Sequence, residues 1–302
     1  MNVLALIRAM RPHQWIKNVF VLAALFFSIA AGESDLGRVR DTLFALAAFC
    51  FGSSTIYLLN DVMDVERDRA HPTKKNRPIA SGEVSVQLAL AASAMCLASA
   101  LALAWRANPQ HGTVALVVGS YMTINFFYSW KLKHIVLLDA FCIASGFLLR
   151  VLAGGIASEA AVSHWLMLCT LFLALFLAFG KRHAEIGLLG DDRGGHRKIL
   201  LEYTPELLNQ LISVLAACTI VCYTMYTVSA ETVAKFGHSQ LVWTVPFVVF
   251  GLFRYLLLVR TRGGGGSPSR VLLGGDVAFV INALLWLGTV SLLLFFGATP
   301  EA

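Results

Sequence analysis

The chain alternates between long runs of apolar residues and short polar segments. The runs are long enough to cross a bilayer, because a membrane-spanning helix needs about 17–25 mostly apolar residues. Nine of them lie at roughly 16–32, 41–60, 84–105, 112–130, 135–156, 163–180, 207–229, 240–259 and 276–297. This pattern predicts an all-α polytopic membrane protein, with nine transmembrane helices forming one bundle domain over residues 1–302.

The composition agrees with this class. The chain has 57% hydrophobic and only 14% charged residues, and its mean hydropathy is +0.70, which is outside the range of soluble globular proteins. The first apolar run is not expected to be a cleaved signal peptide, because the small residues Ala30 to Gly32 are followed directly by another spanning run.

Basic residues predict the orientation. Lys and Arg concentrate in alternate loops, whereas the opposite loops hold only Arg38, Arg40, Arg106 and Lys235. Because cytoplasmic loops carry the excess of positive charge, we expect a cytoplasmic N-terminus, an external C-terminus and residence in the cytoplasmic (inner) membrane. The basic residues are dispersed over several loops without an aromatic platform or a recognition helix, so nucleic acid is not an expected partner.

The most polar stretch is Asn60 to Gly82, which follows the second apolar run. If the helix continues to residue 68, Asp61, Asp64 and Asp68 fall within about 60° of one another on one face. Carboxylates at such a short distance repel one another unless a cation lies between them. Oxygen ligands around a partly hydrated site suit Mg²⁺ bridging to a phosphate, so we take these three residues as catalytic metal ligands.

A second charged stretch, Gly180 to Lys198, follows the sixth run. Lys181 and Glu185 are spaced i,i+4 on one helix face with Arg182 beside them, and a solvated ion pair is the alternative to a binding role. Five further substrate-binding candidates lie at the inner ends of helices: Lys17, Asn18, Tyr128, Lys131 and Lys133. For Tyr128 an interfacial belt role is the alternative, and for the last two lysines the positive-inside bias alone is a sufficient explanation.

Asp139 and Arg150 lie within the fifth run. Ionisable groups inside a membrane face the bundle interior and pair, so each is a functional candidate, with structural pairing as the alternative. Gly154 and Gly155 allow helices to approach closely. The six cysteines lie in apolar segments without a C-x-x-C pair and are interpreted as small core residues. The Gly263–Ser267 stretch, GGGGS, is expected to be flexible.

The motif N-D-x-x-D-x-x-x-D, on an inner loop after the second helix, resembles the first Asp-rich motif of the UbiA superfamily of intramembrane prenyltransferases. At the place of that superfamily's second Asp-rich motif, this chain has Lys181, Arg182 and Glu185 instead of a run of aspartates. Together with RPHQWIKN, YLLNDVMDVERDRAHPTKKNRPIASG, LLRVLAGGIA, GKRHAE and EYT, this departure resembles the decaprenyl-phosphate phosphoribosyltransferase branch.

The resemblance implies transfer of the 5-phosphoribosyl group of phosphoribosyl diphosphate (PRPP) to a polyprenyl phosphate. Diphosphate is released, and the product leads to a lipid-linked arabinose donor for cell-wall polymers. The implied cofactor is Mg²⁺, held with the diphosphate by Asp61, Asp64 and Asp68 in a cavity that faces the cytoplasm, with Asn60 orienting these ligands.

Charge and location add the remaining assignments. Lys74 and Arg77 are assigned to phosphate oxygens, and Lys181 and Arg182 to the 5-phosphate or the lipid phosphate. Glu185 is assigned to the metal or the ribose hydroxyls. The acceptor phosphate is already an anionic nucleophile, so no strong general base is expected.

Two other functions stay open at this stage. An aromatic prenyltransferase of the UbiA type would use a prenyl diphosphate donor; the first motif permits this, and the Lys181–Arg182 replacement argues against it. A transporter of anionic lipid or metabolite is the second alternative, against which stands the concentration of charge on one side. The prenyl chain length and the oligomeric state, a homo-oligomer included, are not determined by the sequence.

Overall fold

A computed structural model describes residues 3–108, 110–189, 202–261 and 276–297. Every regular element in these residues is helical, as the apolar runs predict. The GGGGS stretch and the part of the second charged stretch beyond residue 189 lie outside the described residues.

The predicted spans are confirmed with one qualification. Within the described part of the chain, eight helices are long and apolar enough to cross a membrane: Pro12–Ala30, Leu36–Met63, Val86–Ala107, Leu138–Ala157, His164–Gly187, Pro205–Val228, Gln240–Arg260 and Val277–Phe296. The remaining predicted run, 112–130, forms helix α6, Thr113–Trp130. Helix α6 is not among these eight.

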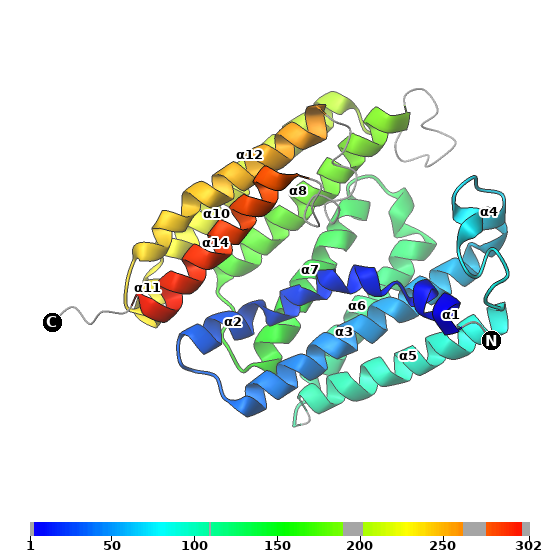
Figure 1. The fold of residues 1–302 in the computed structure, drawn as a ribbon, viewed down its shortest axis with the longest axis horizontal. Coiled ribbons are helices and arrows are strands. Elements are labelled where there is room, and N and C mark those ends of the chain that lie inside the picture. The colour runs from blue at the N-terminus through cyan, green and yellow to red at the C-terminus, as the bar shows by residue number, and fades with distance from the viewer. Residues whose placement is uncertain (1–2, 109, 190–201, 262–275, 298–302) are drawn as a thin grey trace. The chain divides into compact units, whose positions relative to one another are not determined.

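The chain divides into two compact units. Unit 1 comprises Met1–Ile29, Ser34–Trp130 and Leu149–Ala161. It holds α1 (Val3–Met10), η1 (Pro12–Leu22), most of α2 (Ala23–Ala30), α3 (Leu36–Met63), α5 (Val86–Ala107) and α6. The long helix α3 is its centre, because it packs against α5, η1, α6 and α1 (Figure 1).

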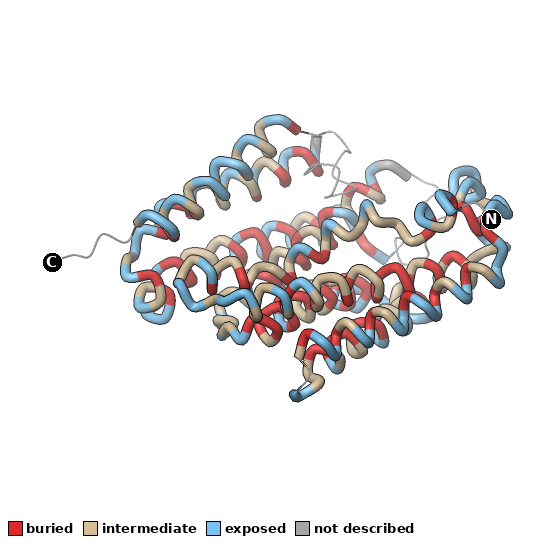
Figure 2. The backbone as a smooth tube through the Cα atoms, turned by 60° about the horizontal axis from the view of Figure 1, so that its bottom comes forward, coloured by how far each residue is buried: buried red, intermediate tan, exposed pale blue. Residues whose placement is uncertain are grey.

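Small residues form the contact face of α5. Its buried positions include Ala89, Ser93, Cys96, Ala100 and Ala104, which recur every three or four residues. This spacing puts them on one face of the helix, and Figure 2 shows buried and exposed positions alternating along it in this way. Small side chains let α3 and α5 approach closely, as is usual between membrane helices.

The α7 helix, Leu138–Ala157, contributes its second half to unit 1. A Cβ atom placed on Gly154 would overlap the carbonyl oxygen of Val21 in η1. Only glycine fits this contact, so the predicted close approach at Gly154 is confirmed.

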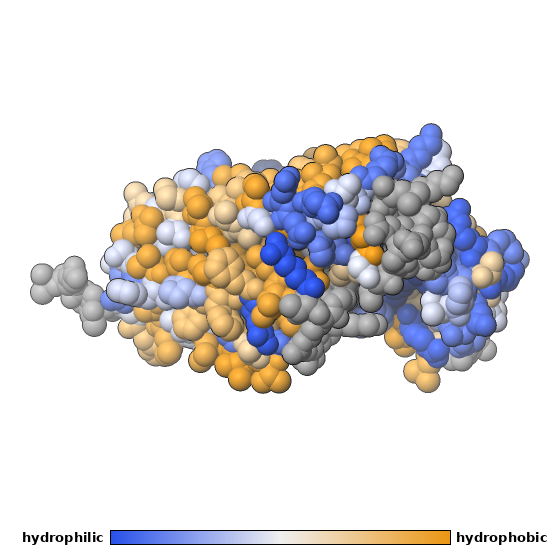
Figure 3. Space-filling view, turned by 90° about the horizontal axis from the view of Figure 1, so that it is seen from above, coloured by the Kyte–Doolittle hydropathy of each residue, from blue (hydrophilic) through white to orange (hydrophobic). Residues whose placement is uncertain are grey.

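Unit 2 comprises Ala30–Glu33, Lys131–Leu148 and Val162–Ala302. It holds the first half of α7, α8 (His164–Leu189), α10 (Pro205–Val228), α11 (Ala230–Phe236), η5 (Gln240–Thr244), α12 (Val245–Thr261) and α14 (Val277–Phe296). Its core contains Phe176, Phe179, Tyr203, Leu208 and Tyr255. Outward-facing positions remain apolar, as in Leu284 and Phe253, and apolar residues form broad areas on the face drawn in Figure 3. Exposed apolar area of this kind suits contact with lipid.

The first span is not a uniform α-helix. After α1, Arg11 takes a left-handed conformation with φ 56° and ψ 57°. The next 11 residues form the 3₁₀ helix η1 and only then does α2 begin. A 3₁₀ stretch of this length is uncommon and is typical of strained or functional segments; Lys17 and Asn18 both lie in it.

Candidate active site

The acidic motif lies at a break between two helices of unit 1. Helix α3 ends at Met63, Asp64 caps it with φ −97° and ψ 9°, and the short helix α4 follows at Val65–Arg69. Backbone hydrogen bonds from Asp64 to Asn60 (2.9 Å) and from Asp68 to Asp64 (2.8 Å) continue across the break. Helix α3 thus passes into α4 at Asp64, in the middle of the motif, with i,i−4 hydrogen bonds kept on both sides of it.

Asp61 and Asp68 are brought together by an arginine. Each is 2% exposed. The Nη1 atom of Arg77 donates to Asp61 Oδ1 at 3.0 Å and to Asp68 Oδ2 at 2.6 Å. Two nearly buried carboxylates thus share one cationic nitrogen, which offsets their mutual repulsion.

Asp64 is placed differently. Its side chain is 30% exposed and lies 3.4 Å from Arg67 Nη1. Among the described residues, no group of three or more His, Cys, Asp and Glu side chains is arranged to hold a metal ion. Asp61 and Asp68 are thus joined through Arg77, and the expectation that Asp64 shares their face stays a prediction.

The pair nevertheless fits a divalent cation. Mg²⁺ in proteins is usually bound through one or two carboxylates, with substrate phosphates and water completing its shell. Asp61 and Asp68 offer hard oxygen atoms around a single cationic position, which Arg77 Nη1 now holds. Asp61 and Asp68 are the residues that would hold Mg²⁺ there, and Asp64 stays a prediction as a ligand.

Buried apolar residues fix the loop that carries Arg77. Ile79 and Val84 are each 1% exposed and pack in a cluster with Leu58, Ala5 and Ala9. The loop closes through Val84 N–H donating to Pro78 O at 2.9 Å. The arginine is thus held beside the carboxylates by hydrophobic anchors just after it in sequence, whereas Lys74, in the short helix η2 (Lys74–Asn76), is exposed.

A second polar cluster lies inside unit 1. Asn18, 1% exposed, accepts a hydrogen bond from Arg150 Nε at 2.8 Å and donates to Cys50 Sγ at 3.3 Å. Arg150 also donates to Tyr121 Oη at 2.9 Å and its guanidinium lies over the Tyr121 ring at 4.6 Å. The expectation that Arg150 faces the interior and finds partners is confirmed. The substrate contacts assigned to Asn18 and to its half-buried neighbour Lys17 stay predictions.

The residues of the second charged stretch belong to unit 2. Arg182 is 2% exposed and donates to Asp139 Oδ2 at 2.8 Å and to Glu185 Oε2 at 2.7 Å. Lys181 is 46% exposed and its Nζ lies 3.8 Å from Glu185 Oε1. The structure thus separates two neighbouring cations: Arg182 is enclosed between carboxylates, and Lys181 is accessible to a phosphate.

Tyr203 completes this network. Its hydroxyl donates to Asp139 Oδ1 at 2.9 Å and accepts from the backbone N–H of Leu137 at 2.7 Å. Leu137 has a φ of 66°, which is strained for a side chain of this size. Burial is the main reason that the pKa of Tyr203 is raised. Tyr203 therefore anchors the connection before α7 to the carboxylate that holds Arg182.

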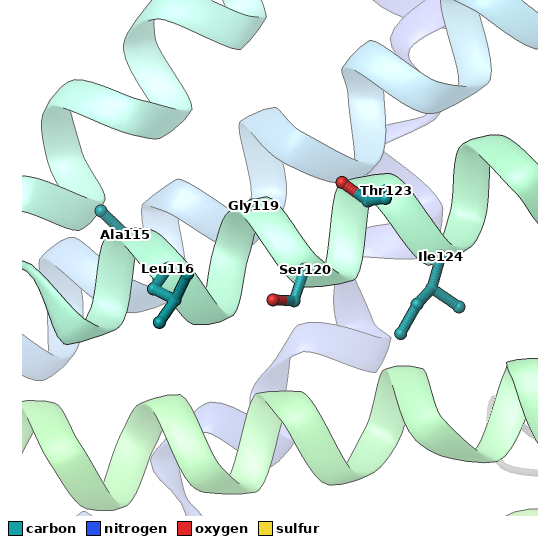
Figure 4. Close-up of a pocket in the computed structure, with 6 residues that line it drawn as sticks. All are labelled: Ala115, Leu116, Gly119, Ser120, Thr123 and Ile124. Atoms are coloured by element: carbon teal, nitrogen blue, oxygen red, sulfur yellow. The ribbon is translucent and has the colours of Figure 1, made fainter.

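The remaining predicted residues are less enclosed. Tyr128 lies near the end of α6 and is half-buried, Lys131 is exposed, and Lys133 is half-buried in the short helix η3 (Leu132–His134). Leu116, Ser120 and Ile124 point to one side of the same α6 (Figure 4). They line an open groove of about 510 Å³ together with Ala115, Gly119 and Thr123. None of the predicted site residues lines this groove.

Sequence reasoning left two site residues without a role. Arg11 is the first residue of the RPHQWIKN motif, and its Nη2 donates to Asp61 Oδ1 at 2.6 Å. Tyr203 lies in the EYT segment and carried no charge signal. The sequence shows only that each is a polar residue near a helix end. It does not show the partner, because each contact joins residues far apart along the chain.

Comparisons with known proteins show which family the chain belongs to. The family model described as the UbiA prenyltransferase family matches residues 19–273. The chain belongs to the UbiA prenyltransferase family. This UbiA family member is 36% identical to a decaprenyl-phosphate phosphoribosyltransferase of Mycolicibacterium smegmatis, over 97% of this chain and 93% of that protein. It is 38% identical to the enzyme of the same name from Corynebacterium glutamicum, over 93% of this chain and 84% of that protein.

Solved structures share the fold of this UbiA family member. A UbiA homolog from Archaeoglobus fulgidus bound to GPP and Mg²⁺ has a TM-score of 0.71 at 20% identity, covering 96% of this chain and 99% of that one. A digeranylgeranylglyceryl phosphate synthase has a TM-score of 0.68 at 17% identity, covering 96% and 98%. The predicted membership and the predicted helical UbiA-type architecture are therefore confirmed, and the chain is an integral membrane protein.

Proposed function

We propose that this chain is a phosphoribosyltransferase that moves the 5-phosphoribosyl group of PRPP to a polyprenyl phosphate. The observation that carries this proposal is the similarity, at 36–38% identity over nearly the whole chain, to enzymes named decaprenyl-phosphate phosphoribosyltransferase. The product would serve as a precursor of a lipid-linked arabinose donor for cell-wall polysaccharide.

The charge of the site supports this donor. PRPP carries a diphosphate and a separate 5-phosphate, so its binding requires a metal platform and additional cations. The Asp61–Asp68 pair offers the metal platform, and Arg77 contacts both carboxylates. The accessible Lys181 offers a separate cation for the 5-phosphate or the lipid phosphate. A prenyl diphosphate has no group that corresponds to the separate 5-phosphate of PRPP, so it does not need this cation.

The reaction follows from the charges of the substrates. The acceptor phosphate oxygen forms a bond with ribose C1 while the bond from C1 to the diphosphate oxygen breaks, and diphosphate leaves with the electron pair. The acceptor is an anion before the reaction, so no side chain has to remove a proton. Divalent metal, when bound, supplies charge stabilisation to the departing diphosphate.

The side chains position the substrates and stabilise the charges that develop in the reaction. Arg77 and Lys74 bind diphosphate oxygens, and Asn60 orients the carboxylates. Glu185 binds the ribose hydroxyls, where it stabilises the positive charge that develops on the ring. Arg182, enclosed between Asp139 and Glu185, holds the Glu185 carboxylate in place.

Five further residues of the predicted set, Lys17, Asn18, Tyr128, Lys131 and Lys133, are proposed as contacts to substrate. We place the site on the cytoplasmic side, with the N-terminus inside and the C-terminus outside, because PRPP is a charged cytoplasmic metabolite and the loops assigned to that side are basic. We propose Mg²⁺ as the divalent metal.

A donor assay tests the proposal. Purified protein in detergent is incubated with Mg²⁺, PRPP labelled in the ribose and a polyprenyl phosphate, and the organic phase is extracted. We expect labelled lipid from the wild type and from the control Glu66→Gln, whose side chain is 81% exposed, and no labelled lipid from Asp61→Asn. Product formed instead from a prenyl diphosphate and an aromatic acid, without lipid-soluble ribose, would refute it.

A further inference from the structure

Two arginines occupy the carboxylate pair that the proposed function assigns to the metal. Arg77 Nη1 lies between Asp61 and Asp68, at 3.0 Å and 2.6 Å from their oxygens. Arg11 Nη2 lies 2.6 Å from Asp61 Oδ1, the same oxygen that Arg77 contacts. One carboxylate oxygen of Asp61 therefore accepts from two guanidinium groups.

The backbone is strained where it delivers Arg11. With φ 56° and ψ 57°, Arg11 is in the left-handed region, which costs a non-glycine residue of the order of 1–2 kcal/mol. Such strain persists only where surrounding contacts determine it. Here the contacts are the ion pair with Asp61 and the Tyr57 ring, whose centre lies 5.0 Å from the guanidinium carbon. The fold thus uses backbone free energy to bring this cation to Asp61.

Both arginines remain accessible, although the carboxylates are not. The side chain of Arg11 is 25% exposed and that of Arg77 is 30% exposed, whereas Asp61 is 2% exposed. An anion arriving from solvent can therefore reach the guanidinium groups first. Guanidinium groups bind phosphate oxygens in pairs with good geometry.

A divalent ion by itself meets a different situation. To use oxygens of Asp61 and Asp68 it must displace Arg77 and weaken the Arg11 contact, which leaves two guanidinium groups beside a doubly charged cation. Like charges at this distance repel strongly where water is excluded. If diphosphate arrives together with the metal, its oxygens give both arginines new partners, and the charges remain balanced.

We propose that Arg11 and Arg77 are resident counter-ions of the Asp61–Asp68 pair, which pass to the diphosphate group when it binds with the metal. Divalent metal and diphosphate then bind cooperatively, and Arg11 is a further substrate-binding residue. This inference rests on the proposed function only for the location of the metal. It concerns the diphosphate group alone, so it is tested without PRPP and without an acceptor.

The first experiment measures cooperativity in the wild-type protein. Bound Mn²⁺ is measured by electron paramagnetic resonance at a series of free Mn²⁺ concentrations, each set by a metal buffer. The series is recorded in the absence and in the presence of inorganic diphosphate. We expect diphosphate to raise the affinity for Mn²⁺ by about 5- to 150-fold, the range of typical coupling between sites. Equal affinity under both conditions would overturn the proposal.

The variants Arg11→Met and Arg77→Met give the second test, because methionine keeps an apolar stem without the charge. We expect each to bind Mn²⁺ alone more tightly than the wild type, and to bind ³²P-labelled diphosphate more weakly at saturating Mn²⁺. The control is Arg8→Met, whose guanidinium lies 3.6 Å from Glu83 and is 60% exposed; it should change neither affinity.

Opposite signs for the two ligands distinguish this proposal from a structural role, in which both affinities would fall together. A fall in Mn²⁺ affinity in folded Arg77→Met would show that the arginine does not compete with the metal, and would refute the idea. The wild-type titration gives an answer even where a variant does not fold. Cooperative Mn²⁺–diphosphate binding in a protein that fails the PRPP assay would refute the proposed donor and leave this inference standing.

Discussion

Replacement of Asp139 by asparagine removes the charge on which the buried part of unit 2 depends. Asp139 is 0% exposed and Arg182 is 2% exposed, with 2.8 Å between Arg182 Nε and Asp139 Oδ2. Removing one partner of a buried ion pair costs about 3–5 kcal/mol, because a charge is left without compensation. Arg182 keeps Glu185 as a partner at 2.7 Å. We therefore expect a loss of unfolding free energy near the lower end, about 3 kcal/mol.

The measurement is equilibrium unfolding of the purified variant in mixed detergent and lipid micelles. The matched control is Glu33→Gln, which breaks the ion pair of Glu33 with Lys235, also in unit 2 and also 2.8 Å long. Because the Glu33 side chain is 50% exposed, this change should cost only about 0–1 kcal/mol. The two substitutions have the same chemistry and differ in burial.

A rescue experiment shows whether the uncompensated charge causes the loss. Arg182→Met in the Asp139→Asn background removes the buried guanidinium, so the double variant should be more stable than Asp139→Asn alone. Equal losses in Asp139→Asn and Glu33→Gln would refute the reasoning. A double variant that is less stable than the single variant would show that packing of the Arg182 side chain, rather than its charge, holds this region.

Three further predictions follow from the same contacts. Lys181→Ala should raise the KM for PRPP or for the acceptor by roughly tenfold or more, because a hydrogen bond to a charged group is worth about 1.5–3 kcal/mol. The thermal unfolding temperature should change no more than for other surface substitutions. Unchanged kinetics for both substrates would show that Lys181 forms only a solvated ion pair. Gly154→Ala should destabilise the protein by about 1–3 kcal/mol through overpacking against Val21, whereas Gly119→Ala, with open space around the new Cβ, should not, and equal stability of the two variants would contradict the contact. The pKa of Tyr203 is raised above its ordinary value by burial, so the unfolded phenol ionises first and stability is lost as the pH rises above about 10; the stability advantage of the wild type over Tyr203→Phe should narrow between pH 9 and 11, and a constant difference would show that the folded phenol has no raised pKa.

The spans and the charged segments between them were predictable because both depend on local properties. A run of about 20 apolar residues has to be helical in lipid, where its backbone groups must find partners within the segment. The Asn60–Asp68 motif and the charges after residue 180 are likewise contiguous in sequence. Helix α6, Thr113–Trp130, was found for the same reason.

The contacts within the site were not predictable in this way. The expectation that three aspartates share a face assumed an unbroken helix, whereas the structure interrupts the helix at Asp64 and joins Asp61 and Asp68 through Arg77. Arg182 and Lys181 are adjacent in sequence, yet Arg182 contacts Asp139 and Lys181 is exposed; the assignment of Arg182 to substrate stays a prediction. Neighbours in sequence on a helix lie about 100° apart and meet different surroundings.

By itself, the sequence determined the class of protein, the positions of the helices, the acidic motif and the UbiA-type resemblance. The length of an apolar run and a short motif are both properties of contiguous residues. Only the tertiary structure decided which polar groups meet: Arg11 and Arg77 at Asp61, and Arg182 and Tyr203 at Asp139. Most of these partners are far apart in sequence. The packing of Ile79 and Val84 brings Arg77 to Asp61 and Asp68, and a buried charge takes whichever partner the packing around it brings within reach.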